Sequence, residues 1–274
     1  MIKIKNVVYK VVLSLAGTII LIFCLMPLYA VIMVSLTPYS KMFEPMLFPR
    51  YFEISNYTYV FNYILRSLLN SFFYAICTAA IVLCISIPSA YVLARFRFMG
   101  RKAIMFILLF TQMLAGIVLM PAIYSIFVPL GLINSVPAII FIFVGVNLSL
   151  SVWLLVGYFS ALPVEIDEAA IIDGASRLRL IFGVAMPIVK PGIAVSTVFI
   201  FVSTYNEFVI PLFLLSRSRY HTITMILNSF ITATTTEWHL LTAGAIIGMI
   251  PPLVMFIFFQ KSIITDTAAG AVKG

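Results

Sequence analysis

The sequence carries very little charge. Only 9% of its 274 residues are Asp, Glu, Lys or Arg, and 63% are hydrophobic, whereas about a quarter of the residues in soluble proteins are charged. A water-soluble globule of this length could not cover its surface with so few charges and would expose large apolar patches. Lipid is therefore the expected solvent for most of the chain. This excludes secreted disulfide scaffolds, disordered chains and ordinary cytosolic enzymes.

Cysteine and histidine are also scarce. All three cysteines, Cys24, Cys77 and Cys84, fall within apolar stretches, so a disulfide framework is not expected. His221 and His239 stand 18 residues apart with no further ligand at metal-binding spacing. No lysine follows a glycine, so the G-K-[ST] of a phosphate-binding P-loop is absent. We therefore predict no catalytic residues, no metal site and no ATP bound by this chain.

The sequence is dominated by long runs of apolar residues without charge. A helix needs about 20 mainly apolar residues to cross the hydrocarbon core, and turn formers between 129 and 137 divide the longest run in two. The runs predict an all-α membrane protein with six transmembrane helices at about 11-36, 68-94, 103-127, 136-158, 192-215 and 240-260. Together they form one domain over 1-274, with outer loops at 37-66 and 216-239 and a tail at 261-274.

The basic residues sort by side. Twelve of the 17 Lys and Arg lie at the termini or in the loops after the second and fourth spans, and five lie in the other loops. The densest group occupies 95-102. Loops that stay in the cytoplasm carry the excess of Lys and Arg. Both termini are therefore expected in the cytoplasm.

The pattern of the loop after the fourth span, residues 163-187, predicts a pair of short helices. Pro163 suits a helix start, and three acids in the first turn would meet the positive end of the helix dipole: Glu165, Asp167 and Glu168. Gly174 is a natural C-cap, and Ser176 can cap a second helix that ends before Pro187. This predicts a helix-turn-helix under the membrane that offers an apolar surface to another protein. The alternative is an amphipathic helix resting on lipid headgroups. The three acids disfavour this alternative, because anionic lipid would repel them.

The same loop resembles a known motif. Glu168-Ala169-Ala170, Gly174 six positions after the Glu, and Val184-x-Met186-Pro187 are similar to the EAA loop of ABC importer permeases, E-A-A-x3-G-x9-I-x-L-P. The extension Ile172 to Ser176 is typical of carbohydrate importers of the maltose type. The chain is identified as a member of the six-span, MalG-like inner-membrane permease subunits of bacterial type I importers. Asn70-Ser71, Gly131 to Asn134 and the Gly-Ala-Val-Lys-Gly ending also resemble this family.

The resemblance implies a function and a set of partners. The chain would form, with a second permease subunit, the pathway for a sugar or oligosaccharide delivered by an extracellular or periplasmic solute-binding protein. Two separate ATPase subunits would bind ATP and Mg and hydrolyse the ATP, so this chain is not expected to be an enzyme or to bind nucleic acid. The alternatives are another solute, such as glycerol phosphate or a polyamine, and less favoured, a secondary transporter. The residues implied in coupling to the ATPases are Glu168, Ala169, Ala170, Asp173, Gly174 and Pro187.

Polar residues inside the spans are the candidates for the translocation pathway. Glu207 is the only residue between 191 and 216 that is charged at neutral pH, and a charge within a span is a functional hypothesis by default. The full set is Tyr205, Asn206, Glu207, Asn147, Ser151 and Gln112. Hydrogen bonding between helices is the alternative for Glu207, Asn147, Ser151 and Gln112, and a further alternative for Glu207 is that it reaches the outer headgroups. Tyr205 stands where the family commonly has Trp, and Ala115 and Ser149 stand where it commonly has Pro. In the last outer loop, Tyr220, His221 and Asn228 are the candidates for contact with the binding protein.

Overall fold

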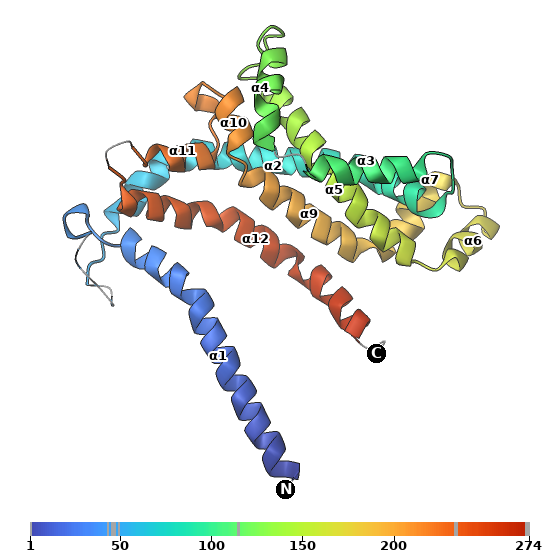
Figure 1. The fold of residues 1–274 in the computed structure, drawn as a ribbon, viewed down its shortest axis with the longest axis horizontal. Helices are drawn as coiled ribbons and strands as arrows, with labels where there is room; N and C mark the ends of the chain where they lie inside the picture. Colours follow the sequence, from blue (N-terminus) through green and yellow to red (C-terminus); the bar gives the residue numbers. More distant parts are fainter. Residues whose placement is uncertain are drawn as a thin grey trace. The chain divides into compact units, whose positions relative to one another are not determined.

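The computed structural model describes residues 2-42, 44, 48, 50-113, 116-232 and 235-271. Regular structure in these residues is helical, apart from one isolated bridge between Ile231 and Thr236. The predicted all-α class is confirmed (Figure 1). The five longest helices are α1 (Ile2–Ser35), α2 (Ser55–Arg95), α5 (Val136–Ala161), α9 (Lys190–Tyr205) and α12 (Trp238–Ala271).

The helices divide into complete spans and bent pairs. Four are long and apolar enough to cross a membrane by themselves, namely Val12–Ser35, Ser55–Arg95, Val136–Ala161 and Trp238–Ile263. Two further candidates are helix pairs bent by more than 40°. One consists of α3 (Arg101–Met113) and α4 (Gly116–Phe127), and in the other residues 177-188 meet α9 at 83°. The described chain thus has four spanning helices, or up to six if each bent pair is one span.

Several helix bounds differ from those expected from hydropathy. The run 192-215 is interrupted, because α9 ends at Tyr205 and a separate short helix, α10 (Val209–Leu214), follows. The run 103-127 consists of α3 and α4 on either side of residues 114-115, which lie outside the described residues. Helix α2 begins at Ser55, inside the expected outer loop 37-66, and α12 continues through most of the expected tail. Residues 272-274 of that tail also lie outside the described residues.

By its internal contacts the chain divides into two compact units, residues 1-65 with 227-249 and residues 66-226 with 250-274. In the first unit, Asn56 of α2 donates hydrogen bonds to the carbonyl oxygens of Ser35 (3.0 Å), the last residue of α1, and Thr37 (3.2 Å), just beyond it. The hydroxyls of Ser35 and Tyr57 lie 2.6 Å apart. These bonds occupy backbone carbonyls that the end of α1 leaves without helical partners. They hold the end of α1 against the start of α2.

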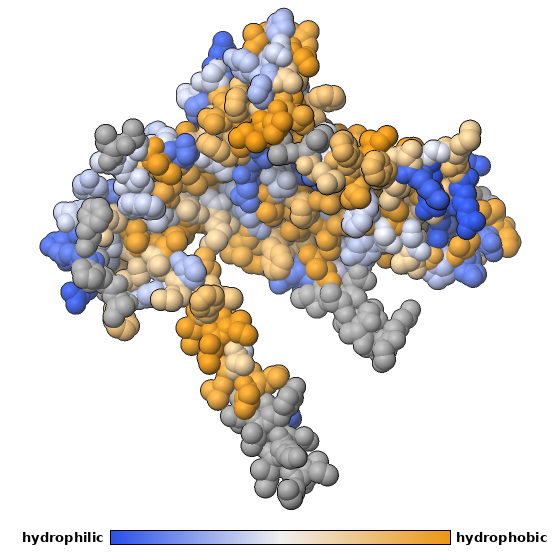
Figure 2. All heavy atoms as spheres, viewed as in Figure 1, coloured by the Kyte–Doolittle hydropathy of each residue, from blue (hydrophilic) through white to orange (hydrophobic). Residues whose placement is uncertain are grey.

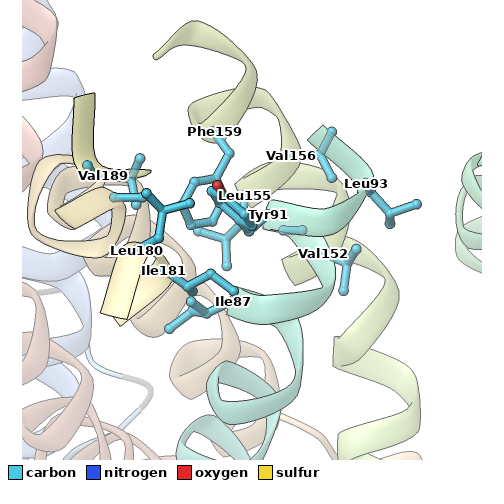
Figure 3. Close-up of a cluster of buried hydrophobic side chains, with 13 residues drawn as sticks. Ile87, Tyr91, Leu93, Val152, Leu155, Val156, Phe159, Leu180, Ile181 and Val189 are labelled. Carbon is cyan, nitrogen blue, oxygen red and sulfur yellow. The ribbon is translucent and has the colours of Figure 1, made fainter. Parts of the chain in front are cut away.

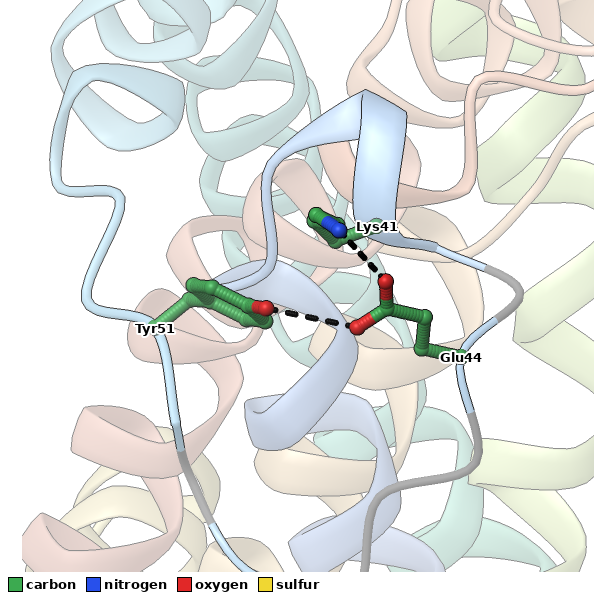
Figure 4. A network of polar contacts seen from close by, with 3 residues as sticks. All are labelled: Lys41, Glu44 and Tyr51. Carbon is green, nitrogen blue, oxygen red and sulfur yellow. Dashed lines mark hydrogen bonds and ion pairs between the residues drawn. The ribbon is translucent and has the colours of Figure 1, made fainter.

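The segment after α1 also carries an exposed polar network. The Lys41 ammonium donates to the Glu44 carboxylate at 2.6 Å, and the Tyr51 hydroxyl donates to the other oxygen of that carboxylate at 3.3 Å (Figure 4). The hydrogen bond from Lys41 lowers the pKa of Glu44, and the same bond raises the pKa of Lys41. Exposed ion pairs of this kind add little to stability. The network therefore orders the loop locally.

The second unit is built around α5. This helix is apolar around its whole circumference, and 61% of its most apolar window is buried, as expected for a helix surrounded by other helices. It packs against α3 and α9. Near the end of α5, Leu155 and Phe159 lie against Tyr91 of α2 and against Leu180 and Ile181 from the helical segment that follows α6 (Val164–Ile172) (Figure 3). This cluster anchors the loop 163-187 to the helices.

The surface of the unit is largely apolar. Hydrophobic residues cover much of the helices in Figure 2, and large side chains on α3, such as Phe106, Ile107 and Phe110, are exposed. A soluble protein avoids apolar surfaces of this extent. Hydrophilic residues gather at the end of this unit that holds α6, α7 (Arg177–Arg179) and the connection between α2 and α3. The candidate site lies at that polar end.

Candidate functional site

The first half of the loop 163-187 is the short helix α6. Glu165 and Asp167 lie in its first turn, where their charge favours the helix, and Pro163 immediately precedes it. Gly174 ends it in a left-handed conformation, with φ of 77°. The Gly174 N–H donates to the Ile171 carbonyl (3.0 Å) and the Ala175 N–H to the Ala170 carbonyl (2.9 Å), which is the Schellman pattern of helix termination. The predicted helix and its glycine cap are confirmed, but Glu168, expected as a third acid of the first turn, lies just beyond that turn because the helix begins at Val164.

The second half of the loop is helical for longer than expected. The Ser176 hydroxyl accepts from the Arg179 N–H at 3.4 Å, as predicted for a helix cap. The helix then continues through α7 (Arg177–Arg179), a wider π-helical turn, η2 (Leu180–Ala185), and α8 (Met186–Ile188). The expectation that it ends before Pro187 is wrong. Proline has no N–H and its ring crowds the preceding turn, and the wider turn just before Pro187 relieves that crowding.

A buried ion pair fastens α6 to the end of α2. Arg95 Nε lies 2.7 Å from an oxygen of Asp167, and both side chains are 9% exposed. The two terminal nitrogens of the guanidinium donate to the carbonyl oxygens of Leu162 (2.9 Å) and Pro163 (3.3 Å), at the junction of α5 and α6. The Tyr91 side chain also interacts with the Asp167 carboxylate. One arginine therefore joins three helices.

Sequence reasoning missed this role of Arg95. It counted the residue only among the cations of the loop 95-102, and it treated Asp167 only as a first-turn acid. The available signal was an arginine at the last position of a long apolar helix, which is a place where a charged side chain can turn back to polar groups. Its partner, 72 positions further along the chain, could not be read from local spacing.

The residues expected to couple to ATPases differ in exposure. Glu168, Ala169, Asp173, Gly174 and Pro187 are exposed, and Ala170 is buried against the hydrophobic cluster. The exposed surface of α6 also includes large apolar side chains: Val164, Ile171 and Ile172, the last of which is 85% exposed. Beside it lies a cleft of about 520 Å³, whose lining includes Glu168, Arg97 and Arg177. Exposed apolar residues next to charges of both signs suit contact with a protein.

Two of the pathway candidates on α5 are held in hydrogen bonds between helices. Asn147 donates to the Thr204 hydroxyl of α9 at 3.3 Å. Ser151 lies 2.9 Å from Ser86 of α2 and 2.8 Å from Ser196 of α9, measured between hydroxyl oxygens, and all three serines are buried. These are the contacts expected for the interhelical alternative. On α3, the more exposed Gln112 donates to the Val146 carbonyl at 3.4 Å.

The remaining candidates surround the break between α9 and α10. Tyr205 is buried and stacks on Phe201 with 5.7 Å between ring centroids, whereas Asn206 is exposed. The Glu207 carboxylate accepts from the N–H groups of Val209 (2.9 Å) and Ile210 (3.2 Å). It thus caps α10, where N–H groups lack helical partners. This local bond explains how an acid is accommodated in an apolar stretch.

The segment after α10 is tied to α2 by its backbone. Asn70 donates to the carbonyls of Arg219 and His221, both at 3.0 Å, and the Tyr74 hydroxyl donates to the Tyr220 carbonyl at 3.1 Å. The side chains of Tyr220 and His221 are half-buried. Asn228, the third residue expected to contact a binding protein, lies in α11 (Ile223–Ser229) and is exposed. The backbone at 219-221 is therefore held in one conformation while its side chains stay accessible.

Comparison with known proteins places the chain in a family. Residues 83-267 match the family described as binding-protein-dependent transport system inner membrane component. Because this match spans more than half of the chain, the chain belongs to that family. It is a membrane transport subunit and not an enzyme.

Individual relatives agree with this placement. The chain is 30% identical to the trehalose/maltose transport system permease protein MalG of Thermococcus litoralis over 98% of this chain and 99% of the relative. It is 34% identical to the maltodextrin transport system permease protein MdxG of Bacillus subtilis over 68% of this chain and 67% of the relative. A solved bacterial ABC transporter that imports the acidic polysaccharide alginate shares the fold, with a TM-score of 0.78 at 21% identity, covering 94% of this chain and 97% of that one.

Proposed function

We propose that this chain is one of two unlike permease subunits that line the path of a sugar or oligosaccharide through an ATP-driven importer. The observation that carries the proposal is the similarity to a trehalose/maltose permease over 98% of the chain and to a maltodextrin permease over 68% of it. Cargo of another class, such as glycerol phosphate or a polyamine, is the alternative. Selection of the cargo rests mainly with the solute-binding protein, so a ligand screen on that protein distinguishes the two.

We propose six membrane spans with both termini in the cytoplasm. Each bent pair, α3 with α4 and residues 177-188 with α9, then counts as one span. The excess of Lys and Arg at the termini and in the loops 95-102 and 163-187 supports this orientation. The orientation puts α6 on the side where ATP is available.

We propose that α6 docks on an ATPase subunit and that the two ATPase subunits hold the ATP and Mg. The exposed Glu168, Ala169 and Ile172 would form the contact, and Gly174 and Asp173 would shape its end. The ion pair between Arg95 and Asp167 supports a mechanical role, because a helix fastened to α2 and α5 moves them when it is pushed. ATP binding by the partners would then change which state of the pathway binds solute better, and that difference is sufficient for transport.

We propose that Gln112, Asn206 and the Tyr205 ring border the pathway, with Glu207 holding the α9–α10 break open beside it. Asn147 and Ser151 serve the pathway indirectly, because their hydrogen bonds fix the spacing of α2, α5 and α9. Tyr220, His221 and Asn228 face the binding protein. A backbone already held by Asn70 and Tyr74 limits the entropy lost when that protein docks.

Uptake in liposomes tests the proposal. The transporter is reconstituted with its ATPase and binding-protein partners, and uptake of labelled maltodextrin is measured with ATP inside, with and without an ionophore. We expect uptake that requires ATP and resists the ionophore. Glu168→Arg should abolish uptake and the substrate-stimulated ATPase activity, whereas Glu44→Arg, the same charge change in the exposed loop after α1, should preserve both. Uptake that collapses with the ion gradient would show a secondary transporter instead.

A further inference from the structure

The connection between α2 and α3 carries cations without partners. Among the described residues, the side chains of Arg97, Arg101 and Lys102 form no ion pair or hydrogen bond, in contrast to Arg95, which is fully engaged with Asp167. All three line one hollow of about 660 Å³. Three positive charges without an ion-pair partner around a single hollow attract an anion.

The backbone of the connection explains why these charges converge. Gly100 has φ of 97°, a left-handed conformation that reverses the chain. The Arg101 N–H donates to the Phe98 carbonyl at 3.3 Å, and the Ile104 N–H donates to the Gly100 carbonyl at 2.9 Å as α3 begins. The turn thus brings Arg97 back beside the first residues of α3. The positive end of the α3 dipole points to the same place and adds to the attraction for an anion.

An apolar groove adjoins the hollow. Its volume is about 440 Å³, and it is lined by Val92, Leu93 and Pro88 of α2 and by Ile104 of α3, with Ser89 as its one polar side chain. Phe98 lines both the groove and the hollow. The groove therefore continues the cationic hollow towards the two membrane-crossing helices. Met99, at the tip of the turn, is fully exposed.

The two features together match one chemical class of ligand. We propose that the α2–α3 connection binds an anionic phospholipid, with its phosphate on Arg97, Arg101 and Lys102 and one acyl chain in the groove between α2 and α3. A soluble phosphate would leave the groove empty, and a neutral lipid would leave the three charges unpaired. Basic residues near a membrane surface each contribute about a factor of five to the attraction for anionic lipid. The site is independent of the cargo, and it adjoins the cleft beside α6, which Arg97 and Arg101 also line.

Lipid retention by the full-length chain tests the proposal. The protein is purified in a neutral detergent and titrated with phosphatidylglycerol, and binding is followed by native mass spectrometry, with phosphatidylcholine of the same acyl chains as the comparison. We expect one tightly bound phosphatidylglycerol and no equivalent phosphatidylcholine. The triple variant R97Q/R101Q/K102Q should weaken this binding about 100-fold. The matched triple variant R50Q/R66Q/R217Q removes the same charge from exposed positions elsewhere and should bind as the parent does.

Two further arms separate the sources of the anion. Val92→Trp fills the groove and keeps every charge, so it should weaken phosphatidylglycerol binding. This variant replaces the triple variant as the test if the triple variant is unstable. Inorganic phosphate and glycerol phosphate at millimolar concentration should not displace the lipid. Displacement by either, or equal weakening in both triple variants, would overturn the proposal. If the triple variant keeps the lipid but loses binding of the ATPase subunits, the hollow is a protein contact. Uptake can survive any of these results, so they leave the transport assignment untouched.

Discussion

Arg95 and Asp167 form a buried ion pair, with 2.7 Å between Arg95 Nε and the carboxylate, that joins the last residue of α2 to the first turn of α6. The same guanidinium occupies the carbonyls of Leu162 and Pro163. The pair ties a helix expected at the membrane surface to two membrane-crossing helices. The pair would therefore transmit a motion of α6 directly to α2 and α5.

The ion pair should be essential for stability as well as for coupling. Arg95→Met leaves the Asp167 carboxylate buried without its cation, which typically destabilises a protein by about 3–5 kcal/mol. We expect a large drop in the midpoint of thermal unfolding, measured in detergent by intrinsic fluorescence. The double variant R95M/D167L removes both charges and should recover much of the loss.

The control for this experiment is Arg66→Met. Arg66 is exposed on the same helix and has no ion-pair partner among the described residues, so its loss should leave the unfolding midpoint unchanged. Equal midpoints for the Arg95 and Arg66 variants would show that the buried pair contributes nothing. A double variant that transports poorly although its stability has recovered would identify Arg95 as a positioning residue for coupling.

Gly174 should not tolerate a side chain. Its φ of 77° disfavours every L-residue, and no atom lies within 4 Å of an added Cβ, so the penalty of Gly174→Ala is conformational and about 1–2 kcal/mol. Gly174→Asn should be milder, because asparagine accepts the left-handed conformation more readily. Thermal unfolding measures both effects. Gly157→Ala, in the helical interior of α5 with equally open space, should be neutral or stabilising; a matching loss there would contradict the explanation.

Gly192 should be required for the contact between α9 and α5. A Cβ at this position would lie 2.4 Å from the ring of Tyr158. Gly192→Ala must displace the ring or separate the helices, and overpacking of this kind costs about 1–3 kcal/mol. The unfolding midpoint should fall, and Tyr158→Leu in the same chain should restore part of it. If the single and double variants have the same unfolding midpoint, a clash with the Tyr158 ring is not the cause of the destabilisation.

Ser151 should matter for packing more than for solute. Ser151→Ala removes its bonds to Ser86 and Ser196, and interhelical hydrogen bonds in membranes average about 0.6 kcal/mol each. We expect a loss near 1 kcal/mol in unfolding free energy, with the KM for sugar uptake unchanged. Ser203→Ala, on the same helix as Ser196 but only half-buried, is the control. A raised KM with unchanged stability would place Ser151 on the pathway itself.

Local sequence patterns were sufficient for the elements whose cause is local. Glu165 after Pro163, the glycine at 174 and the serine at 176 each act within one helical turn, and all three behave as their chemistry requires. The scarcity of charge likewise determined the solvent, because no arrangement of this chain could bury so much apolar surface in water. These features needed no knowledge of the rest of the fold.

Tertiary structure decided what depends on distant partners. Hydropathy could not locate the break after Tyr205, because Glu207 is the only charged residue in a mainly apolar run. The role of Glu207 as a cap depends on α10, from whose N–H groups it accepts hydrogen bonds. It could not separate a pathway serine from a packing serine, because the partners of Ser151 lie on two other helices. The role of Arg95 depends on Asp167, which two further spans separate from Arg95 along the sequence. Composition and local pattern determined a membrane protein with a capped helix in one loop; only the packing of α2, α5 and α6 decided which charge holds that helix, because an ion pair depends on distance in space and not on distance along the chain.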